Sequence, residues 1–303
     1  MSDKWKDHLL KSSLPLEQLV AEKLIKKNLQ IAGEYPYIRP NEQNINTEFS
    51  VDLHAYATYA KGGVTSTRLN YLIECKYNYP GVKWVFTPHT NGLGNPLFSY
   101  TISHEENEIL FHLWELSRYI PFYIPICTRG IELHNNGFDP NIIFHGLNQL
   151  LYGMPNLIFQ EANIVKHRSY RVNIGVDESI IYLILVTTAD LFVLKTNQSL
   201  EIYHTAKSLD DIAEKVDVLL VEQELGPNLQ QYCEWLLAPT IPSSIETDFR
   251  GMKKLILREL VPEVFQVIVV NFDKLDDILS LTSESFGYPI SPMIKQIVRP
   301  KKD

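Results

Sequence analysis

Apolar residues recur at helical spacing near the start of the chain. Leu16, Val20 and Leu24 fall on one face of a helix between about residues 16 and 28, and lysines occupy positions off that face. This pattern predicts an amphipathic helix that packs its apolar face on a core. Gly33 and the two prolines that follow it predict that the helix ends there and that a loop begins.

The pattern then changes to the spacing of strands. Residues 48 to 57 carry apolar side chains at alternate positions over part of their length, and residues 69 to 77 (LNYLIECKY) form a second strand-like run. Lys61-Gly62-Gly63 between them is a turn signal, so the two runs predict a β-hairpin. The apolar run from 82 to 86 predicts a third strand that continues this meander.

Helical and strand patterns alternate through the rest of the chain. Leu110, Leu113 and Trp114 share one side of a predicted helix over 105–117. Further helices are predicted at 142–152, from Ser208, at 249–258 and at 274–281, further strands at 180–187, 191–195 and 264–271, and a loose tail at 299–303. This mixture predicts an α/β fold with a central mixed β-sheet flanked by helices.

The composition is that of a folded protein with a sizeable core. The chain has 303 residues, of which 45% are hydrophobic and 21% charged. Its three cysteines are far apart and include no CxxC pair, which predicts neither a disulfide framework nor a zinc ribbon and favours a reduced, cytoplasmic compartment. The longest apolar run, from Ile180 to Leu194, is interrupted by Asp190, so no membrane association is expected.

The formal net charge of −8 excludes a generally basic nucleic-acid coat protein. It is compatible with a local basic groove. The candidates for phosphate contact are Lys23, Lys27, Lys83, Lys166, Arg168 and Arg171. The alternative for each of these residues is a solvated position on an exposed face.

The residues with the strongest chemical pattern lie on the predicted hairpin. Glu74 and Lys76 are two residues apart on one strand, so their side chains leave the same face. Pairing across the turn brings Asp52 beside Glu74. Two carboxylates at one point require a cation, and oxygen ligands with open positions suit Mg²⁺ or Mn²⁺. The metal would polarise a phosphate, while Lys76 would position or deprotonate a water or stabilise developing charge.

A purely structural explanation exists for the same three residues. A Glu–Lys pair on a surface strand is common and stabilises a sheet without any function. The flanking residues Tyr71-Leu72-Ile73 are apolar, however, and place the charges at the end of a strand that is expected to be buried. Charged residues are rare at such a position unless they have partners.

The hairpin resembles the PD-(D/E)XK, or restriction-endonuclease-like, nuclease family. In that family a helix precedes a hairpin, an Asp opens the hairpin and an E-x-K ends its second strand; here these parts are Phe49-Ser50-Val51-Asp52 and Leu72-Ile73-Glu74-Cys75-Lys76. Val51 stands where the family's name has a proline, a position that varies in the family. The resemblance implies that Asp52, Glu74 and Lys76 are catalytic, with Asp52 and Glu74 as metal ligands.

The resemblance also implies supporting residues on the flanking helices. An acidic residue of the first helix often assists the metal site, which nominates Glu17; Glu22 is the competitor, but it falls on the charged face. Some members carry a glutamine on the later helix, which nominates Gln149. Without a functional role, Glu17 would be a solvated glutamate of the first helical turn, and Gln149 would be a capping or solvated residue.

The similarity implies a nuclease-like core over residues 1–200, with an insertion near 95–135. Residues 201–303 are expected to form a C-terminal α/β extension packed on this core, for specificity, dimerisation or partner binding. The expected function is a Mg²⁺-dependent (or Mn²⁺-dependent) endonuclease acting on DNA, with RNA as the alternative substrate. A prokaryotic restriction or anti-phage defence role follows from the resemblance, with a homodimer or a partner protein as the expected assembly.

Two functions of other classes remain open. The first is a catalytically silent subunit that binds nucleic acid or protein in a larger defence complex. The second is an assembly subunit in which the three charges form a buried ion network. Other catalytic patterns are missing from the sequence: it has no P-loop ending, no Gly-x-Ser-x-Gly elbow and no HExxH pair.

Overall fold

One mixed sheet of 13 strands forms the centre of the computed structural model. The structure describes residues 4–41, 43, 45–61, 65–89, 98–105, 108–115, 124–135, 137–171, 178–237 and 264–284. The strands are β1 (Gln30–Pro40), β2 (Asn46–Lys61), β3 (Thr65–Lys76), β4 (Lys83–Pro88), β5 (Phe98–Glu105), β6 (Glu108–Glu115), β7 (Ile126–His134), β8 (Gly137–Asp139), β9 (Glu178–Thr187), β10 (Asp190–Leu194), β11 (Ala213–Val216), β12 (Val218–Glu224) and β13 (Val264–Asn271). The helices are α1 (Lys4–Lys11), α2 (Leu14–Lys26), α3 (Ile142–Arg171), α4 (Leu200–Thr205), α5 (Leu209–Ile212), α6 (Pro227–Leu237) and α8 (Leu275–Glu284), with a 3-10 turn at Phe272–Lys274.

The strand order combines antiparallel and parallel neighbours. The main path runs β1-β2-β3-β9-β13-β12-β7-β4-β10-β11, and the β5–β6 hairpin and β8 lie off this path. β1, β2 and β3 are successive antiparallel neighbours, whereas β9 is parallel to β3 and to β13. A parallel neighbour requires a crossover, and α3 lies on the chain between β3 and β9.

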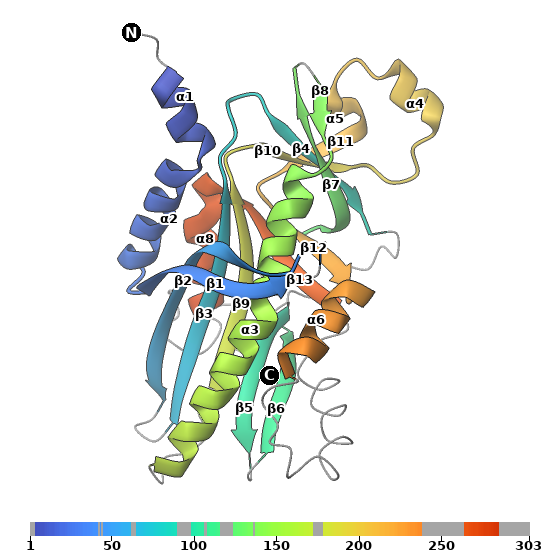
Figure 1. Ribbon diagram of the computed structural model, residues 1–303. Coiled ribbons are helices and arrows are strands. Elements are labelled where there is room, and N and C mark those ends of the chain that lie inside the picture. The colour runs from blue at the N-terminus through green and yellow to red at the C-terminus, as the bar shows by residue number, and fades with distance from the viewer. Residues whose placement is uncertain are drawn as a thin grey trace, which may run out of the picture.

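Helices cover the sheet on both faces, as Figure 1 shows for α3 on one side and for α2 and α8 on the other. Alternate residues of the central strands divide between two apolar clusters. Leu72 and Leu183 pack on the side of α3 and α6, while Ile73 and Ile184 pack on the side of α2 and α8. The near-continuous apolar sequence of β9 follows from this burial on both faces.

Several predicted elements are confirmed. The helix expected from residue 16 is α2, and the hairpin strands are β2 and β3. β9, β10, β13 and α8 lie close to their predicted ranges, and Ser208 precedes α5, where its backbone N–H donates to Asp211 at 3.0 Å. The α/β class with a mixed sheet flanked by helices is also confirmed.

Three local predictions are wrong. The helix expected over 105–117 is instead strand β6, which pairs antiparallel with β5; an apolar run of this length fits either structure, and the antiparallel pairing with β5 decides it. The loop expected after Gly33 is strand β1, because β1 is the outermost strand and an edge strand tolerates Pro36. β4 does not continue the meander: it pairs with β7 and β10.

Some predictions fall outside the described residues: the turn at Gly62-Gly63, the helix over 249–258 and the tail at 299–303. The sheet also joins the two regions on either side of residue 200. β12 and β13 lie between β9 and β7, and β7 itself comes from the region expected to be an insertion. Within the described parts of the chain, none of the helices combines the length and apolar character needed to cross a membrane.

Candidate active site

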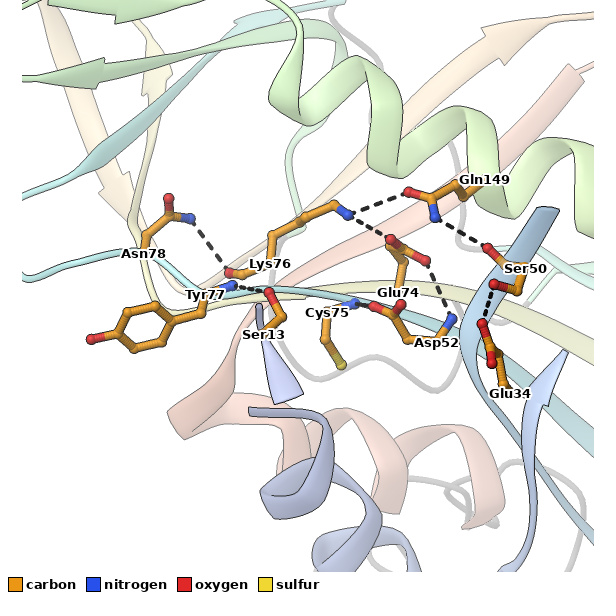
Figure 2. Close-up of polar contacts among 10 residues, drawn as sticks. All are labelled: Ser13, Glu34, Ser50, Asp52, Glu74, Cys75, Lys76, Tyr77, Asn78 and Gln149. Atoms are coloured by element: carbon orange, nitrogen blue, oxygen red, sulfur yellow. Dashed lines mark hydrogen bonds and ion pairs between the residues drawn. The ribbon is translucent and has the colours of Figure 1, made fainter. Parts of the chain in front are cut away.

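The two hairpin strands separate at Asp52. The paired register of β2 and β3 ends at Leu53 opposite Ile73, and beyond this point side chains take over the backbone hydrogen bonds. Cys75 N–H donates to Asp52 Oδ2 at 2.8 Å, and Asp52 N–H donates to Glu74 Oε2 at 3.4 Å (Figure 2). Each carboxylate is thus held by the backbone of the opposite strand, which fixes the two acidic groups close together.

Lys76 connects this pair to helix α3. Its Nζ donates to Glu74 Oε1 at 2.6 Å and to Gln149 Oε1 at 3.3 Å, and Gln149 Nε2 donates in turn to the Ser50 carbonyl at 3.1 Å. Figure 2 shows the ammonium group between the glutamine and the glutamate. Gly146 of α3 leaves room for this lysine, because a Cβ there would lie 3.3 Å from Lys76 Cε.

Glu17 reaches the same place from the other face of the sheet. It lies in the first turn of α2 and, together with Asp52 and Lys76, lines a polar pocket of about 270 Å³. The pocket opens where the separated strands meet the α1–α2 junction and the first turn of α3. Glu74 lies behind the pocket and has 0% of its surface exposed.

Burial and mutual repulsion perturb all three acidic groups. Burial raises the pKa of Glu74 to about 8, although Lys76 opposes the shift. Burial, followed by the charges of Asp52 and Glu34, raises the pKa of Glu17 to about 7. Burial also raises the pKa of Asp52, against the hydrogen bond from Cys75. Three carboxyl groups lie within electrostatic reach of one another here, and a bound cation would relieve their repulsion.

The donor chemistry fits a hard divalent cation. Among the described residues, no group of three or more His, Cys, Asp or Glu side chains is arranged to hold a metal ion. Asp52 and Glu17 nevertheless present carboxylates to the pocket, and Mg²⁺ is commonly held by one or two carboxylates, waters and a substrate phosphate. In this structure the Glu74 oxygens are engaged by Lys76 and by the Asp52 backbone.

The structure brings Glu17, Asp52, Lys76 and Gln149 together with Glu74, as the sequence predicts. It does not bring Glu22 there: Glu22 is exposed and accepts a hydrogen bond from Gln18 at 3.3 Å. The functional roles of the assembled residues stay a prediction, since geometry alone assigns no reaction.

The predicted phosphate contacts lie elsewhere. Lys23 pairs with Asp276 at 2.6 Å, and Lys27 donates to Ser280 at 2.6 Å, so both residues connect α2 to α8. Lys83 is partly buried at the start of β4. The backbone of Lys166, Arg168 and Arg171 belongs to the last turns of α3, and their side chains are outside the described residues.

Sequence reasoning missed three residues that line the pocket: Lys11, Ser13 and His145. Ser13 accepts a hydrogen bond from Tyr77 N–H at 3.1 Å, which ties the α1–α2 junction to the end of β3. His145 precedes Gln149 by four residues, so the helical repeat could have placed both on one face. Lys11 and Ser13 carried no such signal, because helix α1 was not predicted.

No family model, curated protein or solved structure matches this chain. The interpretation of the site therefore depends on its own geometry and chemistry.

Proposed function

We propose that this protein is a divalent-metal-dependent endonuclease that hydrolyses phosphodiester bonds, with DNA as its substrate. One observation carries the proposal: Asp52, Glu74 and Lys76 converge at the point where β2 and β3 separate, beside a polar pocket. Carboxylates that can surround a cation and a lysine held at hydrogen-bond distance are groups that metal-assisted phosphate hydrolysis uses. The raised pKa values of Asp52 and Glu74 are of the kind that cluster at functional sites, and a bound cation would favour the ionised carboxylates.

The order of the elements supports a restriction-endonuclease-like core. Helix α2 precedes the hairpin strands β2 and β3, and the later helix α3 leads into β9, which is parallel to β3; β1 and the strands β4 to β8 are additional to this order. The acidic pair lies on β2 and β3, and the supporting residues Glu17 and Gln149 come from the two helices. A restriction or anti-phage defence role is the biological context that this resemblance suggests.

In the proposed reaction the carboxylates bind the metal and the lysine contacts the water or the phosphate. Asp52 and Glu17 would hold Mg²⁺ in the pocket, with Glu74 behind them. When bound, the cation would polarise the phosphate and acidify a water. The lysine ammonium has three N–H donors, of which Glu74 and Gln149 take two, so one remains for the attacking water or a phosphoryl oxygen.

Two further residues of the pocket suit an anionic substrate. Lys11 of α1 and His145 of α3 line the pocket together with Lys76. Either side chain can donate a hydrogen bond to a phosphate oxygen.

A cleavage assay tests the proposal. Plasmid, linear duplex DNA, single-stranded DNA and RNA are incubated with the protein and Mg²⁺ or Mn²⁺, alongside Lys76→Ala, Asp52→Ala and the matched surface variant Lys215→Ala, whose lysine pairs with Asp190 on the exposed side of β11. We expect metal-dependent cleavage by the wild type and by Lys215→Ala only. A wild-type protein inert on every substrate with either metal, together with a Lys76→Ala variant that keeps the cellular effect, would favour the silent binding subunit.

A further inference from the structure

An arginine lies between two aromatic rings next to the candidate site. The guanidinium carbon of Arg39, near the end of β1, is 4.2 Å from the ring centre of Phe49 and 4.3 Å from that of Tyr152. Phe49 is on the neighbouring strand β2 and Tyr152 is on α3, so the two rings cover the flat group from two different elements. Such stacking holds the cation in one orientation and leaves its N–H edge for hydrogen bonds.

The charge of Arg39 is not balanced by a carboxylate. Within the described residues no Asp or Glu lies at ion-pair distance from it, and its Nε is buried without a hydrogen-bond partner. Arg68 provides the contrast: it also stacks on a tyrosine, but it lies 3.4 Å from a Glu161 oxygen. A partly buried guanidinium with no anion beside it calls for a ligand of negative charge.

Two buried hydroxyl groups lie beside this cation. Tyr37 and Tyr232 are 2% and 3% exposed. The Tyr232 hydroxyl has no hydrogen-bond partner among the described residues, while Arg39 acts on the Tyr37 hydroxyl both by its charge and as a hydrogen-bond partner. Burial raises the pKa of Tyr37 to about 12, and Arg39 partly offsets this effect. Burial likewise raises the pKa of Tyr232, and the charge of Arg39 opposes that shift as well. Leaving a buried donor without an acceptor is unfavourable, and an anionic ligand could accept hydrogen bonds from this group.

This group of residues is continuous with the candidate site. Tyr152 follows Gln149 by three residues on α3, a rise of about 4.5 Å along the helix axis. Phe49 precedes Ser50, whose carbonyl accepts from Gln149, and the Glu74 charge also acts on Tyr37. Tyr152 is seven residues, about 10 Å along the helix axis, beyond the pocket residue His145, so a strand that leaves the pocket along α3 would meet Arg39 after the phosphate in the pocket.

We infer that Arg39, with the Tyr37 and Tyr232 hydroxyls, forms an anion subsite that binds the phosphate neighbouring the scissile one on the substrate strand. The inference rests on the proposed nuclease function for the identity of the ligand. The alternative is that Arg39 only fastens β1 to α3 by its contacts with the two rings. The two roles of Arg39 differ in one respect: an anion subsite binds an anion, whereas a purely structural link between β1 and α3 does not need one.

Binding without catalysis tests the subsite. Fluorescence anisotropy of a labelled single-stranded oligonucleotide, in EDTA and over a series of salt concentrations, is compared for wild type, Arg39→Gln and Arg129→Gln. Arg129 is an exposed arginine of β7 and controls for the loss of one positive charge. We expect Arg39→Gln to weaken binding by about 10-fold or more and to reduce the salt slope by about one, with Arg129→Gln near wild type. Equal binding by wild type and Arg39→Gln would overturn the subsite.

Two further variants keep the test decisive. Tyr37→Phe removes a single hydroxyl whose recorded polar neighbour is Arg39, and the ring that packs in the core stays, so folding is retained. We expect a several-fold loss of oligonucleotide affinity, and unchanged affinity would count against the subsite even where Arg39→Gln does not fold. Asp52→Asn should bind the oligonucleotide in EDTA at least as well as wild type. Arg39-dependent binding by a protein that cleaves nothing would retain the subsite and reject the nuclease, whereas cleavage that is indifferent to Arg39 would do the reverse.

Discussion

Two polar clusters include side chains on the α3 face of β2 and β3. They differ in the balance of their charges and in whether they open onto a pocket. The candidate site is at the end where the strands separate. The second cluster lies further along the paired strands, where His54 Nε2 is 3.1 Å from Asn70 Oδ1 and Asn70 donates to Ser179 at 2.9 Å. Ser179 donates to Glu161 of α3 at 2.7 Å, which makes a chain of buried groups from strand to helix.

The second cluster is closed and balanced. Its one carboxylate, Glu161, is paired with its one guanidinium, Arg68, and its members satisfy one another's hydrogen bonds. The candidate site has three carboxyl groups, of which only Glu74 is paired with a lysine, and it opens onto a pocket. Buried polarity alone therefore does not indicate function; unbalanced charge beside an opening does.

The largest difference between the clusters should appear in activity. We expect Lys76→Met to lower the cleavage rate by about 10²–10⁴-fold, the range for removing one positioned proton or charge donor. The protein should still fold, because the raised pKa of Glu74 lets that carboxyl become neutral when its partner is removed. Single-turnover cleavage together with circular dichroism measures both properties. A loss smaller than tenfold would remove Lys76 from the catalytic group.

The reverse result is expected for the closed cluster. Glu161→Ala leaves the Arg68 charge buried and removes the acceptor of Ser179, so we expect a loss of about 3–5 kcal/mol in the free energy of unfolding. Cleavage per folded molecule should be retained. Urea denaturation measures the loss, with Glu201→Ala on the exposed face of α4 as the matched control. Equal stability of the two variants would show that the network is not structural.

The two clusters should also respond to pH in opposite directions. Glu74 has a pKa of about 8 in the folded protein against 4.5 in the unfolded chain, so it binds a proton on folding, and its contribution to stability falls as pH rises through this window. Glu17 acts in the same direction up to about pH 7. Burial lowers the pKa of His54 below its usual 6.5, so its contribution rises as pH approaches 6.5.

Melting temperatures in EDTA across this window check the signs. We expect Glu17→Gln to flatten the fall of stability with pH and His54→Gln to steepen its acidic part. Adding Mg²⁺ should raise the melting temperature most at the alkaline end, where the carboxylates are charged. A Glu17→Gln curve parallel to wild type would mean that this carboxyl is not coupled to the site.

The smallest expected effect comes from a single methyl group. In Gly146→Ala the new Cβ would lie 3.0 Å from Leu185 Cδ1 and 3.3 Å from Lys76 Cε, so one of them must move. Because alanine favours the helix by about 1 kcal/mol, we expect stability near wild type but cleavage reduced by a few fold up to about tenfold. Gly226→Ala, where a Cβ meets nothing within 4 Å, is the control. Full activity of Gly146→Ala would show that the lysine does not need this space.

Local patterns account for much of the fold and for the centre of the site. The alternation in β3 and the spacing of Leu16, Val20 and Leu24 indicate where Glu74 and Glu17 lie. Asp52 lies where β2 departs from alternation, because Val51 packs toward α3 and Leu53 toward α2. The order of the strands in the sheet could not be predicted from local patterns, because the pairing of β4 with β7 and β10 joins segments far apart in sequence. The sequence did not single out Arg39, because a proline-containing edge strand has the composition of a loop, and a loop was predicted there.

The position of β13 has a consequence for how the chain assembles. Residues 264–271 supply a strand between β9 and β12, although every predicted catalytic residue lies before residue 150. A fragment ending near residue 200 would contain the complete Asp52–Glu74–Lys76 group and yet expose the pairing edge of β9 at residues 184–187. During synthesis the predicted catalytic residues are complete long before the sheet that supports them. A shortened version of this protein should therefore be prone to aggregate through the open edge of β9.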